Sequence, residues 1–321
     1  MKIINVCGFN LSGCTAAFDL FYDYETVGSV NREFHESGFL KCKYTFGGAI
    51  QSVLLEQPFR PSKEELATSL RGDMPDSIGD EANNLSIHNH LVSRKSMAGQ
   101  FGKAFDVFTA QALSVIPGNI NELPKIDALA VYELAARRWL SSVVEHVPRE
   151  NFHLKKITDD SIMMFKNDPP GKFPYVAGLI PNGVSFSVLR DPVDACFDFN
   201  RYYYLGHTEE TVKAYSDIFG SWARTVKNQL AYGLTRAKGK YYVVRFEDLI
   251  QKVSVQDTLL QMVGLDRVNK VSEVFQPKES MQNIGIGREM SASLIGQVEE
   301  LCYPEYNSLI EVLKTHNMLI E

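Results

Sequence analysis

A glycine turn between a buried strand and a helix constrains the fold of this chain most strongly. Residues 2–7, KIINVC, form a short, mostly apolar run without strict alternation, which is typical of a strand covered on both faces of a parallel sheet. Gly8 and Gly13 bracket a short loop, after which apolar residues recur at helical spacing through Tyr24. Strand, glycine turn and helix form the first half of a βαβ unit. We therefore expect an α/β fold with a central parallel sheet.

The turn itself, GFNLSGCT at residues 8–15, has the GxxxxG-x-[ST] spacing of a phosphate-binding loop. Backbone N–H groups and the helix dipole at such a turn can hold a phosphate. The alternative interpretation is a tight structural turn. The predicted cofactor-binding residues here are Asn10, Leu11, Ser12, Gly13, Cys14 and Thr15.

Position 14 argues against a kinase. A nucleoside-triphosphate enzyme of this type places lysine immediately before the Ser or Thr of the loop, where it reaches the β- and γ-phosphates. Cys14 occupies that position here, before Thr15. The turn is therefore expected to hold a phosphate whose charge is met by cations elsewhere in the chain.

The remaining pattern predicts one α/β domain over residues 1–321 with an inserted segment. Residues 50–125 are interpreted as a mostly helical insertion on the acceptor side, and helical patterns cover 126–147, 208–236 and the tail from 291. Further strands are predicted at 26–30, 161–167, 183–189 and 240–246.

A second anchor follows the strand predicted at 183–189. Arg190, Asp191 and Pro192 stand where that strand ends, and ligands of parallel sheets bind at the carboxyl ends of strands. An arginine there can make a bidentate hydrogen-bonded contact to a phosphate. The alternative for Arg190 is a salt bridge to Asp191 or Asp194.

The glycine turn followed by this Arg-Asp-Pro sequence resembles the sulfotransferase family that uses 3′-phosphoadenosine 5′-phosphosulfate (PAPS). Residues 243–249, VVRFEDL, look like the late strand and turn of that family, and residues 278–285, KESMQNIG, are similar to a C-terminal cofactor loop of bacterial members. The resemblance implies a P-loop-like, three-layer fold in which the glycine turn binds the 5′-phosphosulfate and Arg190 the 3′-phosphate. It adds Arg201, Ser280, Asn283, Gly285 and Arg288 to the predicted cofactor-binding residues.

Three positions depart from the family pattern. Leu11 stands where many members carry Lys or Arg, and Cys14 stands where Ser, Thr or Gly is commoner. Asp198 replaces the serine eight residues after the arginine, and its carboxylate would repel a phosphate unless it points away or Arg201 and the C-terminal loop supply the contact. Candidate replacement cations are Lys41, Lys43 and Lys166, of which Lys166 is favoured because it lies in a predicted strand.

Sulfuryl transfer also needs a base for the acceptor proton. Residues 31–35, NREFH, resemble the Asn-Glu-x-His segment of heparan-type sulfotransferases, in which the glutamate is the base. Glu33 is therefore the first candidate and His35 the second, although Arg32 shifts the register by one residue. With Lys166 they form the predicted catalytic set.

Composition excludes several classes of binding partner and site. The net charge of −6, from 33 basic and 39 acidic residues, supplies no basic excess for nucleic acid. No apolar run is long enough for a membrane span or a signal peptide, so a cytoplasmic protein is expected. The five cysteines form no CxxC pair, and His88 and His90 lack further ligands at metal spacing, so no metal site is expected.

These features together predict a PAPS-dependent sulfotransferase that releases 3′,5′-adenosine bisphosphate (PAP). The acceptor would be a hydroxyl or amine of a small polar metabolite or a glycan, and homo-oligomerisation is left open. Two alternatives remain at this stage: a P-loop kinase for a small molecule, and an inactive nucleotide-binding module.

Overall fold

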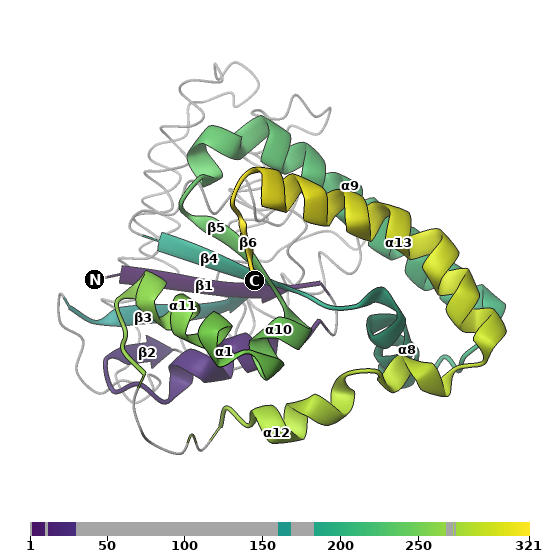
Figure 1. Cartoon of the computed structure of the whole chain (residues 1–321), viewed down its shortest axis with the longest axis horizontal. Coiled ribbons are helices and arrows are strands. Elements are labelled where there is room, and N and C mark those ends of the chain that lie inside the picture. The colour runs from purple at the N-terminus through teal and green to yellow at the C-terminus, as the bar shows by residue number, and fades with distance from the viewer. Residues whose placement is uncertain (1, 10–11, 30–159, 168–182, 268–271, 273) are drawn as a thin grey trace, which may run out of the picture. The chain divides into compact units, whose positions relative to one another are not determined.

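The computed structural model of the chain describes residues 2–9, 12–29, 160–167, 183–267, 272 and 274–321 (Figure 1). All of them belong to one of the two units into which the chain divides, namely Met1–Arg32, Thr158–Gly178 and Asn182–Glu321. The other unit, Glu33–Ile157 with Leu179–Pro181, lies outside the described residues. The helical segments predicted at 50–125 and 126–147 lie there, and the single-domain interpretation stays a prediction.

Six parallel strands form the central sheet in the order β2-β3-β1-β4-β5-β6. They are β1 (Lys2–Gly8), β2 (Val27–Ser29), β3 (Ile162–Asn167), β4 (Gly183–Leu189), β5 (Tyr241–Arg245) and β6 (Leu319–Ile320). β1 lies between β3 and β4, with Val6 paired to Lys166 and Gly8 paired to Val188. The carboxyl ends of these three strands therefore meet at one edge of the sheet.

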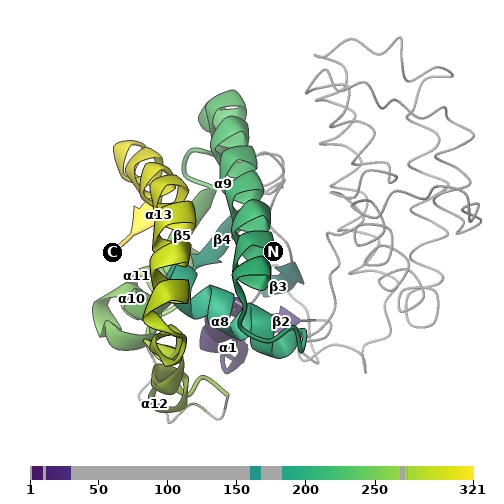
Figure 2. The ribbon, with the colours of Figure 1, turned by 90° about the vertical axis from the view of Figure 1, so that its right-hand side faces the viewer.

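Seven α-helices in the described part of the chain cover both faces of the sheet (Figures 1 and 2). One face carries α1 (Cys14–Tyr22), α10 (Phe246–Gln251) and α11 (Val253–Val263). The other carries α8 (Pro192–Tyr202), α9 (Glu209–Ala237) and α13 (Ala292–Thr315), of which α9 and α13 run side by side in both views. The short helix α12 (Pro277–Ser280) precedes two 3-10 turns, η3 (Met281–Asn283) and η4 (Ile286–Glu289).

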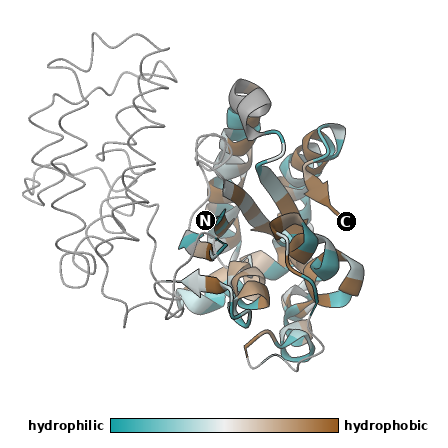
Figure 3. Cartoon of the chain, turned by 90° about the vertical axis from the view of Figure 1, so that its left-hand side faces the viewer, coloured by the Kyte–Doolittle hydropathy of each residue, from teal (hydrophilic) through white to brown (hydrophobic). Residues whose placement is uncertain are grey.

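Alternation along the strands builds an apolar core on each face. Val243 belongs to the core under α8, α9 and α13, whereas its neighbour Val244 belongs to the core under α1, α10 and α11. The same alternation separates Val6 from Cys7 in β1. Because successive strand side chains point to opposite faces, a strand covered on both sides contributes apolar residues to both cores. Figure 3 shows the strands coloured largely as hydrophobic.

The predicted α/β class with a central parallel sheet is confirmed. The strands predicted at 161–167, 183–189 and 240–246 coincide with β3, β4 and β5 within a residue at each end, and the helix at 208–236 coincides equally well with α9. The two-residue strand β6 was not predicted, since it is too short to carry an alternation pattern. Within the described ranges, no helix combines the length and the hydropathy needed to cross a bilayer.

Candidate functional site

A pocket of about 490 Å³ opens at the carboxyl edge of the sheet, and we call it the carboxyl-edge pocket. Residues from the turn after β1, from β3, from the end of β4, from α8 and from the α12–η3 segment all line it. They are Gly13, Cys14, Thr15, Ala16, Asp19, Lys166, Arg190, Asp198, Tyr202, Phe246, Ser280 and Asn283. Segments distant in sequence are thereby brought together where parallel sheets hold their ligands.

The glycine turn can be built only from glycine at its two key positions. Gly13 has a φ of +86°, and a Cβ atom there would collide with the Phe246 ring. A Cβ atom on Gly8 would collide with Ser12 Oγ, whose residue is only 2% exposed. The Ser12 hydroxyl finds no hydrogen-bond partner among the described residues. A buried hydroxyl without a partner is costly, so a ligand that reached it would gain a hydrogen bond.

The first turn of α1 faces the pocket without a side-chain cap. Asp191 caps α8 and Ser291 caps α13 through side-chain oxygens, whereas Gly13 at the N-cap of α1 has no side chain to offer. The leading N–H groups of a helix have no partners within the helix and carry partial positive charge. Thr15, in this first turn, and Cys14 both line the pocket.

Lys166 adds a full positive charge at the same place. Its Nζ donates a hydrogen bond of 3.0 Å to Thr15 Oγ1, so β3 delivers the ammonium group to the first turn of α1. A cation beside a helix N-terminus is unfavourable by itself, since both ends of that contact are positive. An anion bound between the two would reverse the sign of the interaction.

Arg190 is the deepest cation of the pocket, only 4% exposed, and it lies over the Phe246 ring at 5.2 Å. Its Nη1 donates to Asp198 Oδ2 at 2.5 Å and its Nη2 to the Asn283 carbonyl at 2.5 Å. The sequence suggests Asp191 or Asp194 as the ion-pair partner of Arg190. In the structure the partner is Asp198. Arg201, 59% exposed at its side chain, contacts the other Asp198 oxygen at 2.8 Å.

The two neighbouring aspartates have structural roles. Asp191 accepts hydrogen bonds from the amides of Val193 and Asp194 at the start of α8. The Asp194 carboxylate accepts the Gly285 amide at 2.7 Å and the Gly287 amide at 2.8 Å, which ties the C-terminal loop to α8. Gly287 permits this approach, because a Cβ there would lie 2.6 Å from the backbone of Val193.

The predicted C-terminal cofactor residues therefore divide into two groups. Ser280 and Asn283 line the pocket. Gly285 gives its amide to Asp194, and Arg288 is exposed; neither lines the pocket, and the same holds for Arg201. Ser12 contributes through the buried side of the turn rather than through the pocket wall.

Sequence reasoning missed Phe246 and Asp19. Phe246 follows β5 directly, as Arg190 follows β4, so its place at a strand end was the available signal. Asp19 lies one helical turn beyond Thr15 on the pocket side of α1, a spacing that the sequence displays. Both positions could have been found by tracing which residues follow strands or share a helix face with the turn.

Glu247 stabilises the turn formed by Arg190, Asp191 and Pro192. Its Oε1 accepts a hydrogen bond of 2.9 Å from the amide of Asp191. Burial raises the pKa of Glu247 above its ordinary value, while hydrogen bonds from the amides of Asp191 and of Glu247 itself act in the opposite direction. The carboxylate thus fixes the backbone immediately after Arg190.

Several predicted residues lie outside the described part of the chain. They are Asn10, Leu11, Glu33, His35, Lys41, Lys43, His88 and His90. Their assignments stay predictions. The Tyr202–Tyr204 run, within the described residues, is largely at the surface: Tyr204 is 95% and Tyr202 63% exposed, and Tyr202 lines the pocket.

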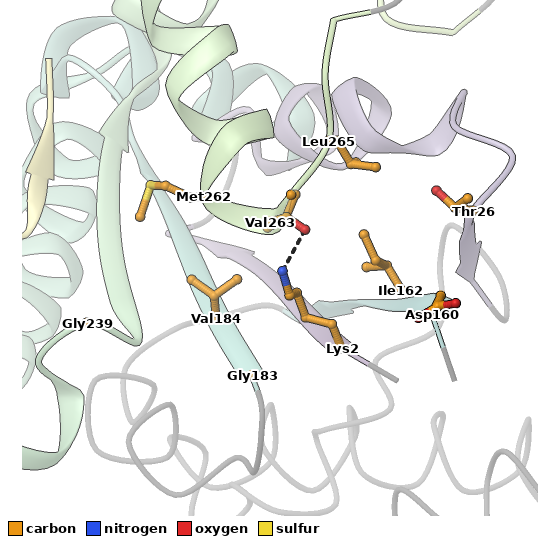
Figure 4. Close-up of a pocket in the computed structure, with 11 residues that line it drawn as sticks. Lys2, Thr26, Asp160, Ile162, Gly183, Val184, Gly239, Met262, Val263 and Leu265 are labelled. Carbon is orange, nitrogen blue, oxygen red and sulfur yellow. Dashed lines mark hydrogen bonds between the residues drawn. The ribbon is translucent and has the colours of Figure 1, made fainter. Parts of the chain in front are cut away.

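A second pocket, of about 710 Å³, lies at the opposite, amino edge of the sheet, and we call it the amino-edge pocket (Figure 4). The residues that start or precede the strands line it, including Lys2, Thr26, Ile162 and Gly183. Figure 4 shows Lys2 reaching the end of α11, where its Nζ donates to the Val263 carbonyl at 2.8 Å.

Comparison with known proteins assigns no family to this chain. No protein-family model and no curated protein matches the chain. In the described residues no group of three or more His, Cys, Asp and Glu side chains has the arrangement of a metal site. The functional proposal therefore rests on the chemistry of the carboxyl-edge pocket.

Proposed function

We propose that this chain is a nucleotide-dependent transferase that moves a sulfuryl group from PAPS to a hydroxyl or amine. The observation that carries the proposal is the placement of Lys166 at the uncapped first turn of α1, 3.0 Å from Thr15 Oγ1. Two positive groups that face one pocket favour an anion bound between them, and the Asp19 carboxylate on the same wall offsets part of their charge. A phosphate or phosphosulfate is the anion that a glycine turn of this spacing suits.

The residues present fit such a donor in size and in donor chemistry. The pocket volume of about 490 Å³ falls within the roughly 300–1,000 Å³ range of small-molecule sites. Glycine at positions 8 and 13 lets the turn pack closely against Ser12 and Phe246, and Gly13, Cys14 and Thr15 of the turn line the pocket. Arg190 supplies a second cation at the end of the neighbouring strand β4.

In this assignment the turn after β1, Thr15 and Lys166 hold the 5′-phosphosulfate, and Arg190 with Ser280 and Asn283 lies toward the 3′ end of the nucleotide. When bound, PAPS supplies the sulfuryl group, which is transferred to the acceptor, and PAP is released. Lys166 would stabilise the negative charge that develops on the leaving phosphate. Glu33, with His35 as second choice, remains the proposed base for the acceptor proton.

The test is the conversion of PAPS to PAP in the presence of a panel of hydroxyl and amine acceptors, followed by chromatography of both nucleotides. We expect acceptor-dependent release of PAP by the wild-type chain. Lys166→Met should lower turnover by about 10²–10³-fold, the scale of one lost electrostatic contact to developing charge. Lys2→Met, which removes the lysine at the opposite edge of the sheet, is the matched control and should retain turnover.

Each alternative has its own outcome in the same experiment. Magnesium-dependent consumption of ATP with no consumption of PAPS would replace the proposal by the kinase. Binding of PAP without turnover by any acceptor would replace it by the nucleotide-binding module.

A further inference from the structure

Asp198 lies between two arginines in an ion cluster that we define as Arg190, Asp198 and Arg201. Asp198 Oδ2 accepts from Arg190 Nη1 at 2.5 Å, and Asp198 Oδ1 lies 2.8 Å from Arg201 Nη2. Arg190 and Asp198 are 4% and 9% exposed, so their contact is largely withdrawn from solvent. The deepest cation of the pocket is thus already paired with a carboxylate of the chain.

Local structure fixes this pairing. Asp191 and Pro192 start α8 immediately after Arg190, and Asp198 lies two helical turns further on. Residues at this spacing lie on nearly the same side of a helix, so the carboxylate returns toward the strand end. The Phe246 ring under the guanidinium and the Asn283 carbonyl on Nη2 hold Arg190 from its other sides.

The charges that line the pocket consequently balance. Lys166 and Arg190 contribute two positive charges, and Asp19 and Asp198 contribute two negative charges. The two ends differ in their positive groups: Lys166 and the first turn of α1 stand with Asp19 at one end, whereas Asp198 covers Arg190 at the other and also contacts Arg201. A ligand with one anionic end finds a complementary site, whereas a second phosphate at Arg190 must compete with Asp198.

We propose that Asp198 determines the nucleotide specificity of this pocket: it occupies the phosphate-binding side of Arg190, so that a 3′-phosphate adds little to binding. A carboxylate there accepts a hydrogen bond from a ribose hydroxyl and repels a phosphate. The donors accepted are therefore 5′-phosphosulfate nucleotides with a free 3′-hydroxyl as well as those with a 3′-phosphate. This inference rests on the proposed function, since it concerns the same pocket.

The experiment is isothermal titration of adenosine 5′-monophosphate (AMP) and of PAP, two ligands that differ only in the 3′-phosphate. For the wild-type chain we expect dissociation constants within about threefold of each other, since Asp198 already accepts the Arg190 hydrogen bond that a second phosphate would need. For Asp198→Asn and Asp198→Ser we expect PAP to bind at least about tenfold more tightly, with AMP nearly unchanged.

Asp257→Asn is the matched control. Asp257 also pairs with an arginine at 2.5 Å, Arg267, but at an exposed position away from the pocket, so this variant should keep the wild-type ratio of the two dissociation constants. The wild-type ratio needs no variant, so the inference remains testable even if an Asp198 variant fails to fold.

Three results would overturn the inference. One is a wild-type preference for PAP over AMP of more than about thirtyfold, which would mean that Asp198 gives way to the phosphate. Another is an unchanged ratio in a folded Asp198→Asn variant that binds both nucleotides; either of these leaves the proposed function standing. Absence of binding by both nucleotides to the wild-type chain and to the variants would overturn the proposed function as well.

Discussion

The two edges of the sheet carry pockets of opposite character. The amino-edge pocket is the larger, about 710 Å³ against about 490 Å³, yet its lysine, Lys2, is already satisfied by the carbonyl at the end of α11. At the carboxyl edge, Lys166 instead meets the first turn of α1, where helix N–H groups also carry positive charge.

This difference follows from the direction of the helices in a parallel α/β fold. A helix that follows a strand begins at the carboxyl edge of the sheet and ends at the amino edge. Its positive end therefore lies at one edge and its negative end at the other. A lysine at the amino edge completes a helix C-terminus, whereas Lys166 at the carboxyl edge adds to the positive end of α1. Pocket chemistry, rather than pocket volume, points to the functional edge.

The largest expected effect separates two glycines with positive φ, one at each edge. Gly13→Ala should destabilise the chain by about 2–4 kcal/mol, because it combines a strained backbone with a collision against Phe246. Gly264→Ala, at a φ of +79°, meets only the end of the Lys2 side chain at 3.4 Å and should cost about 1 kcal/mol. Urea unfolding of both variants measures the difference, and equal costs would mean that Phe246 does not press on the turn.

A smaller effect is expected for the lysines Lys166 and Lys2, whose replacement should affect the stability of the free chain differently at the two edges. Lys166→Met should weaken PAP binding by about 1.5–3 kcal/mol while leaving the free chain as stable as before or slightly more stable, because it relieves the cation at the α1 terminus. Lys2→Met should cost about 0.5–1.5 kcal/mol of stability through the lost bond to Val263 and leave PAP binding unchanged. Calorimetric titration and thermal unfolding of both variants check this, and a loss of stability in Lys166→Met would show that the lysine is structural.

Much of the fold could be predicted because its strands are covered on both faces. Residues 183–189, GVSFSVL, read as a buried strand of apolar and small residues and form β4 over the same range. The start of α8 could be read equally well, since Asp191 and Pro192 are a helix cap and a first-turn proline. Lys166 and Thr15 are 151 positions apart in the sequence. The family resemblance called for a replacement cation, and the predicted strand favoured Lys166 over Lys41 and Lys43.

The pairing inside the pocket could not be predicted in the same way. Sequence spacing suggested Asp191 or Asp194 as the partner of Arg190, but Asp191 is used as a helix cap and Asp194 holds two amides of the C-terminal loop. Those competing contacts leave Asp198 for the arginine. The competition depends on a loop more than 90 residues away in sequence, so no local pattern contains it.

The most direct test of a nucleotide site at the carboxyl edge is thermal unfolding of the wild-type chain with PAP, ADP and ATP–Mg²⁺ in parallel. A ligand at about 100 times its dissociation constant stabilises the folded state by about 2.7 kcal/mol, which corresponds to a rise in Tm of a few degrees. A sulfotransferase site with the glycine turn and Lys166 as its anchor predicts this rise with PAP and none that requires ATP–Mg²⁺. A rise with ATP–Mg²⁺ alone, or no rise with any of the three, would contradict it.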